Sequence, residues 1–318
     1  MKTINPKELT LAAVLAVLSI VTFWYWSFAI ADFVEKDFKV TSAQVTPLFF
    51  LVLTAAIFGL SAIFIKNSRL LYTGATVATL APFFFVRATG GVLAVLVLAL
   101  FLMVIAIRRT QKEFALSLGF SLSKIIRSGI PIYFTLASLI VSTYYFSNLN
   151  EERALASFLP KPALEFTVKL LAGSLKSITG IPLRAEATVD EVLTELVKKG
   201  LEEQGLSFSR ITPEVLRQAV TKERETFAAQ YKIKLQGDEK IIDVLQSTAR
   251  ERIQGLLGPA SYYLPALSTL TFFFAFKALT LPLYFIALLA AWILLKLMII
   301  GKILKSEKQE VAIERLTL

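Results

Sequence analysis

Long apolar stretches separated by short polar segments dominate this chain and predict membrane-spanning helices. The hydrocarbon core of a bilayer requires about 20 mostly apolar residues per helix. The first half of the chain predicts five spans, at about 9–31, 47–65, 70–86, 91–107 and 130–146. Two further spans are expected within 259–304, at about 262–276 and 282–303, with Lys277 and Pro282 marking the turn between them. The pattern therefore predicts an all-α, polytopic helical membrane protein with about seven spans.

The apolar stretch 70–107 is too long for one span and is broken near its middle. Pro82, Arg87, Gly90 and Gly91 lie at this break. Proline removes a backbone donor and glycine weakens a helix, so we expect a turn there. Because interrupted spans mark binding sites in some transporters, these four residues are also candidates for a binding site.

Residues 110–127 combine basic side chains with apolar residues at helical spacing. Phe114, Leu118, Leu122 and Ile125 form the apolar face. A basic amphipathic helix of this kind lies in the plane of the lipid headgroups. Alternatively, the segment is a short connector whose apolar face packs on the bundle, and both interpretations can hold together.

The segment 148–258 is much more polar and predicts a separate extramembrane helical domain. Its apolar positions repeat at helical spacing in four stretches, the first of which starts near Leu164. Thr188 and Glu191 form the pattern of a capping box, and Thr212-Pro213 is typical of a helix start. We therefore expect a small helical bundle inserted before the last two spans, and a polar tail at 305–318.

Composition and charge exclude several classes of protein. Apolar residues make up 55% of the 318 residues and charged residues 18%, which is far from the balance of a soluble globular domain. The net charge is +10, yet the segment 148–258 holds sixteen acidic and sixteen basic residues. The basic excess therefore flanks the apolar stretches. This distribution is typical of membrane topology and gives no reason to expect nucleic-acid binding.

The distribution of Lys and Arg in short loops predicts the orientation of the chain. Cytoplasmic loops are enriched in these residues. With the N-terminus in the cytoplasm, the inner segments carry ten of them and the outer loops carry three. The resulting prediction is a multi-pass protein of the plasma membrane with 148–258 extracytoplasmic. Seven spans would also place the basic tail outside, which breaks the same rule. The expected interface anchors are Trp24, Trp26, Arg108, Arg109, Lys112, Lys124 and Arg127.

Little catalytic chemistry remains available to this sequence. The chain has no His and no Cys, and the predicted spans contain no Asp or Glu in their interiors. We therefore expect no catalytic residues, no cofactor and no metal site. Paired carboxylates such as Asp190/Glu191 lie at helix starts, where capping explains them.

Two functions fit these exclusions. The first is a non-enzymatic scaffold or partner-binding component of the cell envelope, which binds a protein through 148–258. The alternative is a passive or partner-driven permease for a lipid or small apolar solute, suggested by the broken hairpin 70–107 and by the phenylalanine runs 83–85 and 272–274.

Overall fold

In the computed structural model of this chain, every regular element in the described residues is a helix. It describes residues 5–36, 38, 40–86, 90–117, 120–158, 164–169, 184, 186–203 and 212–304. Within these residues the only β-type pairing is one isolated bridge between Thr188 and Lys240. The chain divides into two compact units, which we call the first unit (1–149 and 265–318) and the second unit (150–264). The predicted all-α fold is confirmed.

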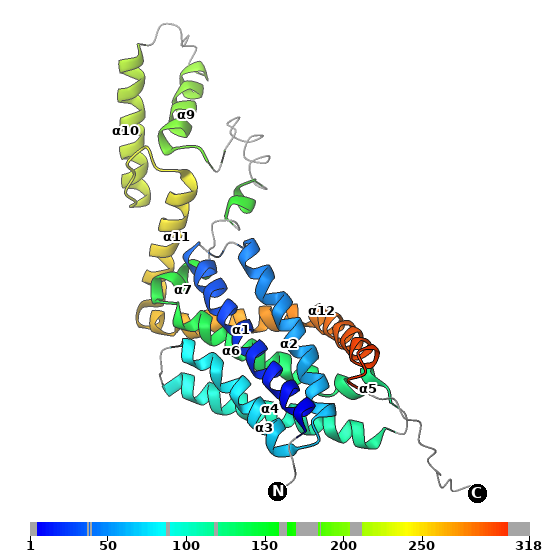
Figure 1. The fold of residues 1–318 in the computed structure, drawn as a ribbon. Helices are drawn as coiled ribbons and strands as arrows, with labels where there is room; N and C mark the ends of the chain where they lie inside the picture. Colours follow the sequence, from blue (N-terminus) through cyan, green and yellow to red (C-terminus); the bar gives the residue numbers. More distant parts are fainter. Residues whose placement is uncertain are drawn as a thin grey trace, which may run out of the picture. The chain divides into compact units, whose positions relative to one another are not determined.

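The first unit is a bundle of apolar helices (Figure 1). Among the described residues, five helical segments are long and apolar enough to cross a membrane, as expected for a helical membrane protein. The helices of this unit are α1 (Pro6–Glu35), α2 (Val45–Phe64) after η1 (Ser42–Gln44), α3 (Ser68–Leu80) followed by η2 (Ala81–Phe85), α4 (Gly90–Leu116), α5 (Leu122–Arg127), α6 (Ile130–Ser147) and α12 (Leu264–Ile300).

The core of the first unit is built from large rings and from close contacts at small residues. Tyr133 of α6 stacks on Phe58 of α2, with ring centroids 4.9 Å apart, and both side chains are fully buried. Gly59 lies against Ile126, and Gly129 lies against Thr110. Small residues at such positions let helices approach closely, which is how helices associate in a membrane.

The predicted turn between Lys277 and Pro282 is wrong, because α12 runs unbroken from Leu264 to Ile300 with Pro282 inside it. Membrane helices tolerate an internal proline. The hydroxyl of Thr280 donates to the carbonyl of Lys277, three residues before it in the same helix, at 2.6 Å. The Lys277 ammonium donates in turn to the Pro131 carbonyl and the Thr135 hydroxyl of α6. The sequence therefore contains one helix where two were predicted.

The predicted single interfacial helix at 110–127 is also wrong. Residues up to Leu116 continue α4, and the next helix in the described residues is the short α5. Leu122, Ile125 and Ile126 of α5 are buried in the core of the first unit. Their burial agrees with the alternative interpretation, in which the apolar face of a connector packs on the bundle.

Polar contacts show which helix ends lie together in the first unit. At one end, Lys7 Nζ donates to the Ile303 carbonyl at 2.8 Å, and the Asn67 amide donates to the Glu8 carboxylate at 3.0 Å. At the opposite end of α1, the Thr41 hydroxyl donates to the Asp32 carboxylate. The start of α1 therefore lies beside the segment that follows the end of α12.

The second unit contains α7 (Glu151–Phe158), α9 (Val189–Glu203), α10 (Pro213–Tyr231), α11 (Ile241–Leu257) and η4 (Gly258–Tyr263). Figure 1 shows α9 and α10 side by side, and Val189, Leu193 and Val220 form the buried contact between them. The predicted capping box is confirmed, because the Glu191 amide donates to Thr188 Oγ1 and the Thr188 amide donates to the Glu191 carboxylate.

Several sequence predictions in the second unit have a different outcome. The helix predicted from Leu164 is helical over 164–169, and its remainder lies outside the described residues. Helix α7 was not predicted as a separate element. In the first unit, the polar tail predicted at 305–318 also lies outside the described residues.

Candidate functional sites

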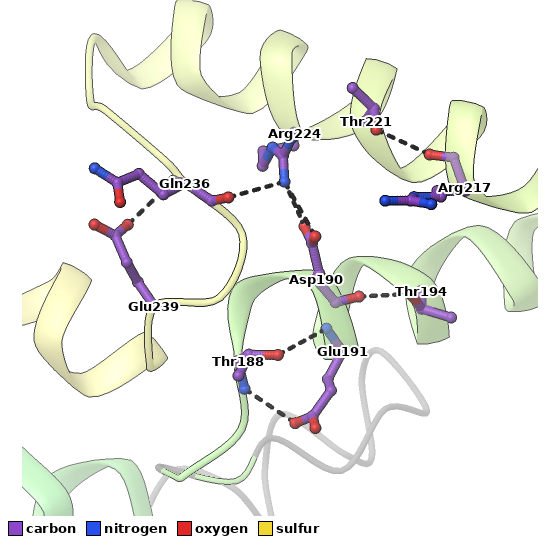
Figure 2. Close-up of polar contacts among 9 residues, drawn as sticks. All are labelled: Thr188, Asp190, Glu191, Thr194, Arg217, Thr221, Arg224, Gln236 and Glu239. Atoms are coloured by element: carbon purple, nitrogen blue, oxygen red, sulfur yellow. Dashed lines mark hydrogen bonds and ion pairs between the residues drawn. The ribbon is translucent and has the colours of Figure 1, made fainter.

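A polar junction ties together three segments of the second unit (Figure 2). Arg224 of α10 donates through Nη1 to both carboxylate oxygens of Asp190, at 3.1 and 3.0 Å. The same nitrogen donates to the Gln236 carbonyl at 3.1 Å, in the loop that leads to α11. The Asp190 side chain is 44% exposed, so solvent screens this ion pair and its energy is modest. The junction therefore fixes geometry more than it adds stability.

Gly237 allows the close approach on which this junction depends. Its φ is +99°, a backbone conformation that residues other than glycine rarely adopt. A Cβ at this position would lie 2.1 Å from Arg224 Nη1 and 2.5 Å from Asp190 Oδ2. The Asp190 amide also donates to the Gly237 carbonyl at 2.9 Å. Glycine is the residue that fits here.

The carboxylates of this region serve helix starts and ion pairs. Glu191 caps α9, as described above, and Glu239 accepts from the Gln236 amide at 3.2 Å. Glu186 accepts from the Lys240 ammonium, and this hydrogen bond raises the pKa of Lys240 above its usual value. No group of His, Cys, Asp or Glu in the described part of the chain could hold a metal ion. Each of these carboxylates thus accepts a hydrogen bond that holds a helix start or a loop in place.

The interrupted span predicted around Pro82 is packed against α6. Pro82 is buried in η2, and its carbonyl accepts from the hydroxyl of the buried Tyr144 at 2.8 Å. Gly90 is exposed at the start of α4, and a Cβ added there would have no atom within 4 Å. Arg87 lies outside the described residues. The structure thus brings Pro82 to α6, while Gly91 lines a separate groove.

That groove lies among α4, α6 and α12 and measures about 370 Å³. Gly91, Val92 and Val95 contribute from α4, and the remaining walls come from α6 and α12. Sequence reasoning identified Gly91 as a helix breaker and as one of four candidates for a binding site at the interrupted span. The sequence did not predict the residues of α6 and α12 that line the groove, because it does not indicate which faces of distant helices pack together.

A row of buried hydroxyl groups inside the first unit was also missed. Thr22 of α1 and Thr54 of α2 share a hydrogen bond of 2.6 Å. Nearby in sequence, Ser19 of α1 and Ser61 of α2 are also buried. The helical spacing of Ser19 and Thr22 on α1, and of Thr54 and Ser61 on α2, is the sequence feature that could have indicated it.

The expected interface anchors divide into exposed and buried residues. Trp24 is 43% exposed, whereas Trp26 is 3% exposed and packs edge-on against Phe276. Trp26 is therefore a core residue of the bundle, and its assignment as an anchor is corrected. The five basic anchors are all exposed, namely Arg108, Arg109, Lys112, Lys124 and Arg127.

No known protein family, curated protein or solved structure matches this chain. A function for this chain is therefore inferred from the geometry of its own residues.

Proposed function

We propose that this chain is a non-enzymatic membrane component that binds a protein partner through its second unit. The outer face of α10 carries the proposal. It is a shallow polar surface with charges of both signs, and most of its side chains are exposed. We call it the α10 face, formed by Glu214, Arg217, Gln218, Thr221, Lys222 and Glu225.

The way α10 is held supports this proposal. Helix α9 covers the opposite side of α10, and the Arg224 junction fixes the two helices at the start of α9. A helix face that is already ordered loses little conformational entropy when a partner binds. Mixed charges on such a face favour a partner with complementary charges and disfavour others.

Photo-crosslinking tests the partner directly. A photoreactive residue at Gln218 is expected to give a defined adduct in intact cells, because Gln218 lies in the α10 face. The same residue at Gln254, which is exposed on α11, is the matched control and should not give this adduct. Reversing two charges with Arg217→Glu and Lys222→Glu should reduce the adduct about tenfold. An adduct that forms equally from both positions, or that survives the reversal, would argue against the α10 face.

The proposed location is the plasma membrane, with both ends of the chain in the cytoplasm. Counting α3 with η2 as one crossing, and α12 as one, gives six crossings. Lys7 and Ile303 touch, which supports an even number. Six crossings also return the basic tail residues Lys305 and Lys308 to the side rich in Lys and Arg, so the conflict with the positive-inside rule disappears. The second unit then lies outside the cytoplasm.

Cysteine labelling measures this orientation, since the chain has no cysteine of its own. Gln254→Cys, at an exposed position of the second unit outside the α10 face, is expected to react with a membrane-impermeant thiol reagent in intact spheroplasts. Thr317→Cys in the tail is expected to react only after lysis. Equal labelling of Thr317→Cys before and after lysis would place the tail outside and contradict the six-crossing arrangement. Protection of Gln254→Cys in intact spheroplasts would contradict the placement of the second unit.

A further inference from the structure

The groove among α4, α6 and α12 has an apolar lining with few polar atoms. Its walls come from Val95 of α4, from Leu139 and Phe146 of α6, and from Leu270 and Phe273 of α12. All of these residues belong to helices that are long and apolar enough to cross a membrane. In a bilayer, lipid acyl chains would contact a lining of this kind.

Three hydroxyl side chains line the groove, and their hydrogen bonds differ. Thr143 donates to the Leu139 carbonyl at 2.8 Å, and Thr269 donates to the Pro265 carbonyl at 2.7 Å. Both hydroxyls are therefore engaged within their own helices. Ser142 is 4% exposed, and its Oγ is buried without a hydrogen-bond partner among the described residues. A buried hydroxyl left unpaired costs about 1–3 kcal/mol, so Ser142 needs an acceptor that the described part of this chain does not supply.

The position of the groove along the helices indicates its depth in the membrane. Gly91 lies in the first turn of α4, Ala266 in the first turn of α12 and Phe146 in the last turn of α6. The groove therefore opens where three helices begin or end. The ends of spanning helices reach the boundary between hydrocarbon and headgroups, which is where the ester groups of lipids lie.

We propose that this groove binds one acyl chain of an ester-linked phospholipid, whose ester carbonyl accepts a hydrogen bond from Ser142. The apolar walls suit a hydrocarbon acyl chain, and the unpaired Ser142 hydroxyl can donate to an ester carbonyl. The groove also opens at the depth where lipid ester groups lie. The groove, at about 370 Å³, would not hold one full turn of a helix, which with its side chains measures about 10 Å across. The proposal is independent of the α10 face and of the partner that it binds.

Photo-crosslinking with a lipid probe tests the site in the full chain. The protein is reconstituted into vesicles containing phosphatidylcholine with a diazirine on one ester-linked acyl chain. Adducts are expected to concentrate in peptides covering 139–146 and 266–273. Ser142→Ala should lower their yield about fivefold, as the loss of one hydrogen bond implies. The matched control is Ser138→Ala on the same helix, whose hydroxyl already donates to the Phe134 carbonyl. It should leave the yield unchanged.

Two further comparisons separate the acyl chain from the ester. An ether-linked probe lacks the carbonyl, so it should label the native chain and Ser142→Ala equally and weakly. Ala266→Trp fills the groove and should abolish its adducts, whereas Ala278→Trp, at an exposed position on α12 outside the groove, should not. The proposal is overturned if adducts spread evenly over the bundle, if Ser142→Ala has no effect, or if the ether-linked probe labels as strongly as the ester.

Discussion

Gly129→Ala is expected to destabilise the first unit by about 1–3 kcal/mol, the usual cost of overpacking a close contact. A Cβ at Gly129 would lie 2.0 Å from Thr110 Oγ1 and 2.8 Å from the Ala106 carbonyl oxygen. The backbone oxygen cannot rotate away, so α4 must move from the start of α6. Thermal unfolding of the purified protein in nanodiscs measures the effect as a lower midpoint.

Thr110 provides a second variant that isolates this contact. The Thr110 hydroxyl donates to the same Ala106 carbonyl at 2.9 Å. Thr110→Ala removes the nearer of the two obstacles, so it should restore part of the stability that Gly129→Ala loses. Gly90→Ala is the matched control, because no atom lies within 4 Å of the position its Cβ would take. If Gly129→Ala and Gly90→Ala unfold at the same temperature, the close approach of α4 is not as described.

Gly237→Ala should have the largest effect in the second unit. The new methyl group meets Arg224 and Asp190, and the positive φ disfavours any residue with a Cβ. We expect a loss of about 1–3 kcal/mol in the local stability of α9 and α10. Hydrogen exchange of the full chain in nanodiscs reports this loss as faster exchange at the amides of Leu193 and Val220.

Gly255→Ala is the appropriate comparison for that experiment. Gly255 lies in α11 with no atom within 4 Å of an added Cβ, so alanine there should slow exchange slightly through its higher helix propensity. If Gly237→Ala and Gly255→Ala change the exchange rates in α9 and α10 equally, the effect comes from replacing glycine in general and not from the Arg224 junction.

The sequence predicted local structure well wherever a short pattern determines it. The capping box at Thr188 and Glu191 and the helix start at Pro213 are both present, because they depend on residues three or fewer positions apart. The apolar stretches predicted α2 and α6 to within two residues at each end. Hydrophobic length alone suffices to place such helices.

Predictions failed where a tertiary contact overrides a local preference. Pro282 disfavours a continuous helix and Lys277 disfavours the membrane interior, but α12 continues through both residues and α6 binds the lysine ammonium. Tryptophan is enriched at membrane interfaces, yet the bundle buries Trp26 against Phe276. The groove at Ser142 depends on three helices that lie far apart in sequence, so no window of residues could have predicted it.

The unbroken α12 also makes this protein sensitive to membrane thickness. Its 37 residues extend about 55 Å, whereas the 18 residues of α6 extend about 27 Å. A hydrocarbon layer of about 30 Å matches α6 and leaves α12 too long. Helix α12 must therefore tilt or carry apolar turns beyond the hydrocarbon, at a cost of a fraction of a kcal/mol per Å of mismatch. A thicker bilayer reduces the hydrophobic mismatch of α12 but exceeds the length of α6. Changing the lipid chain length alone would therefore lower the mismatch cost of one helix and raise that of the other.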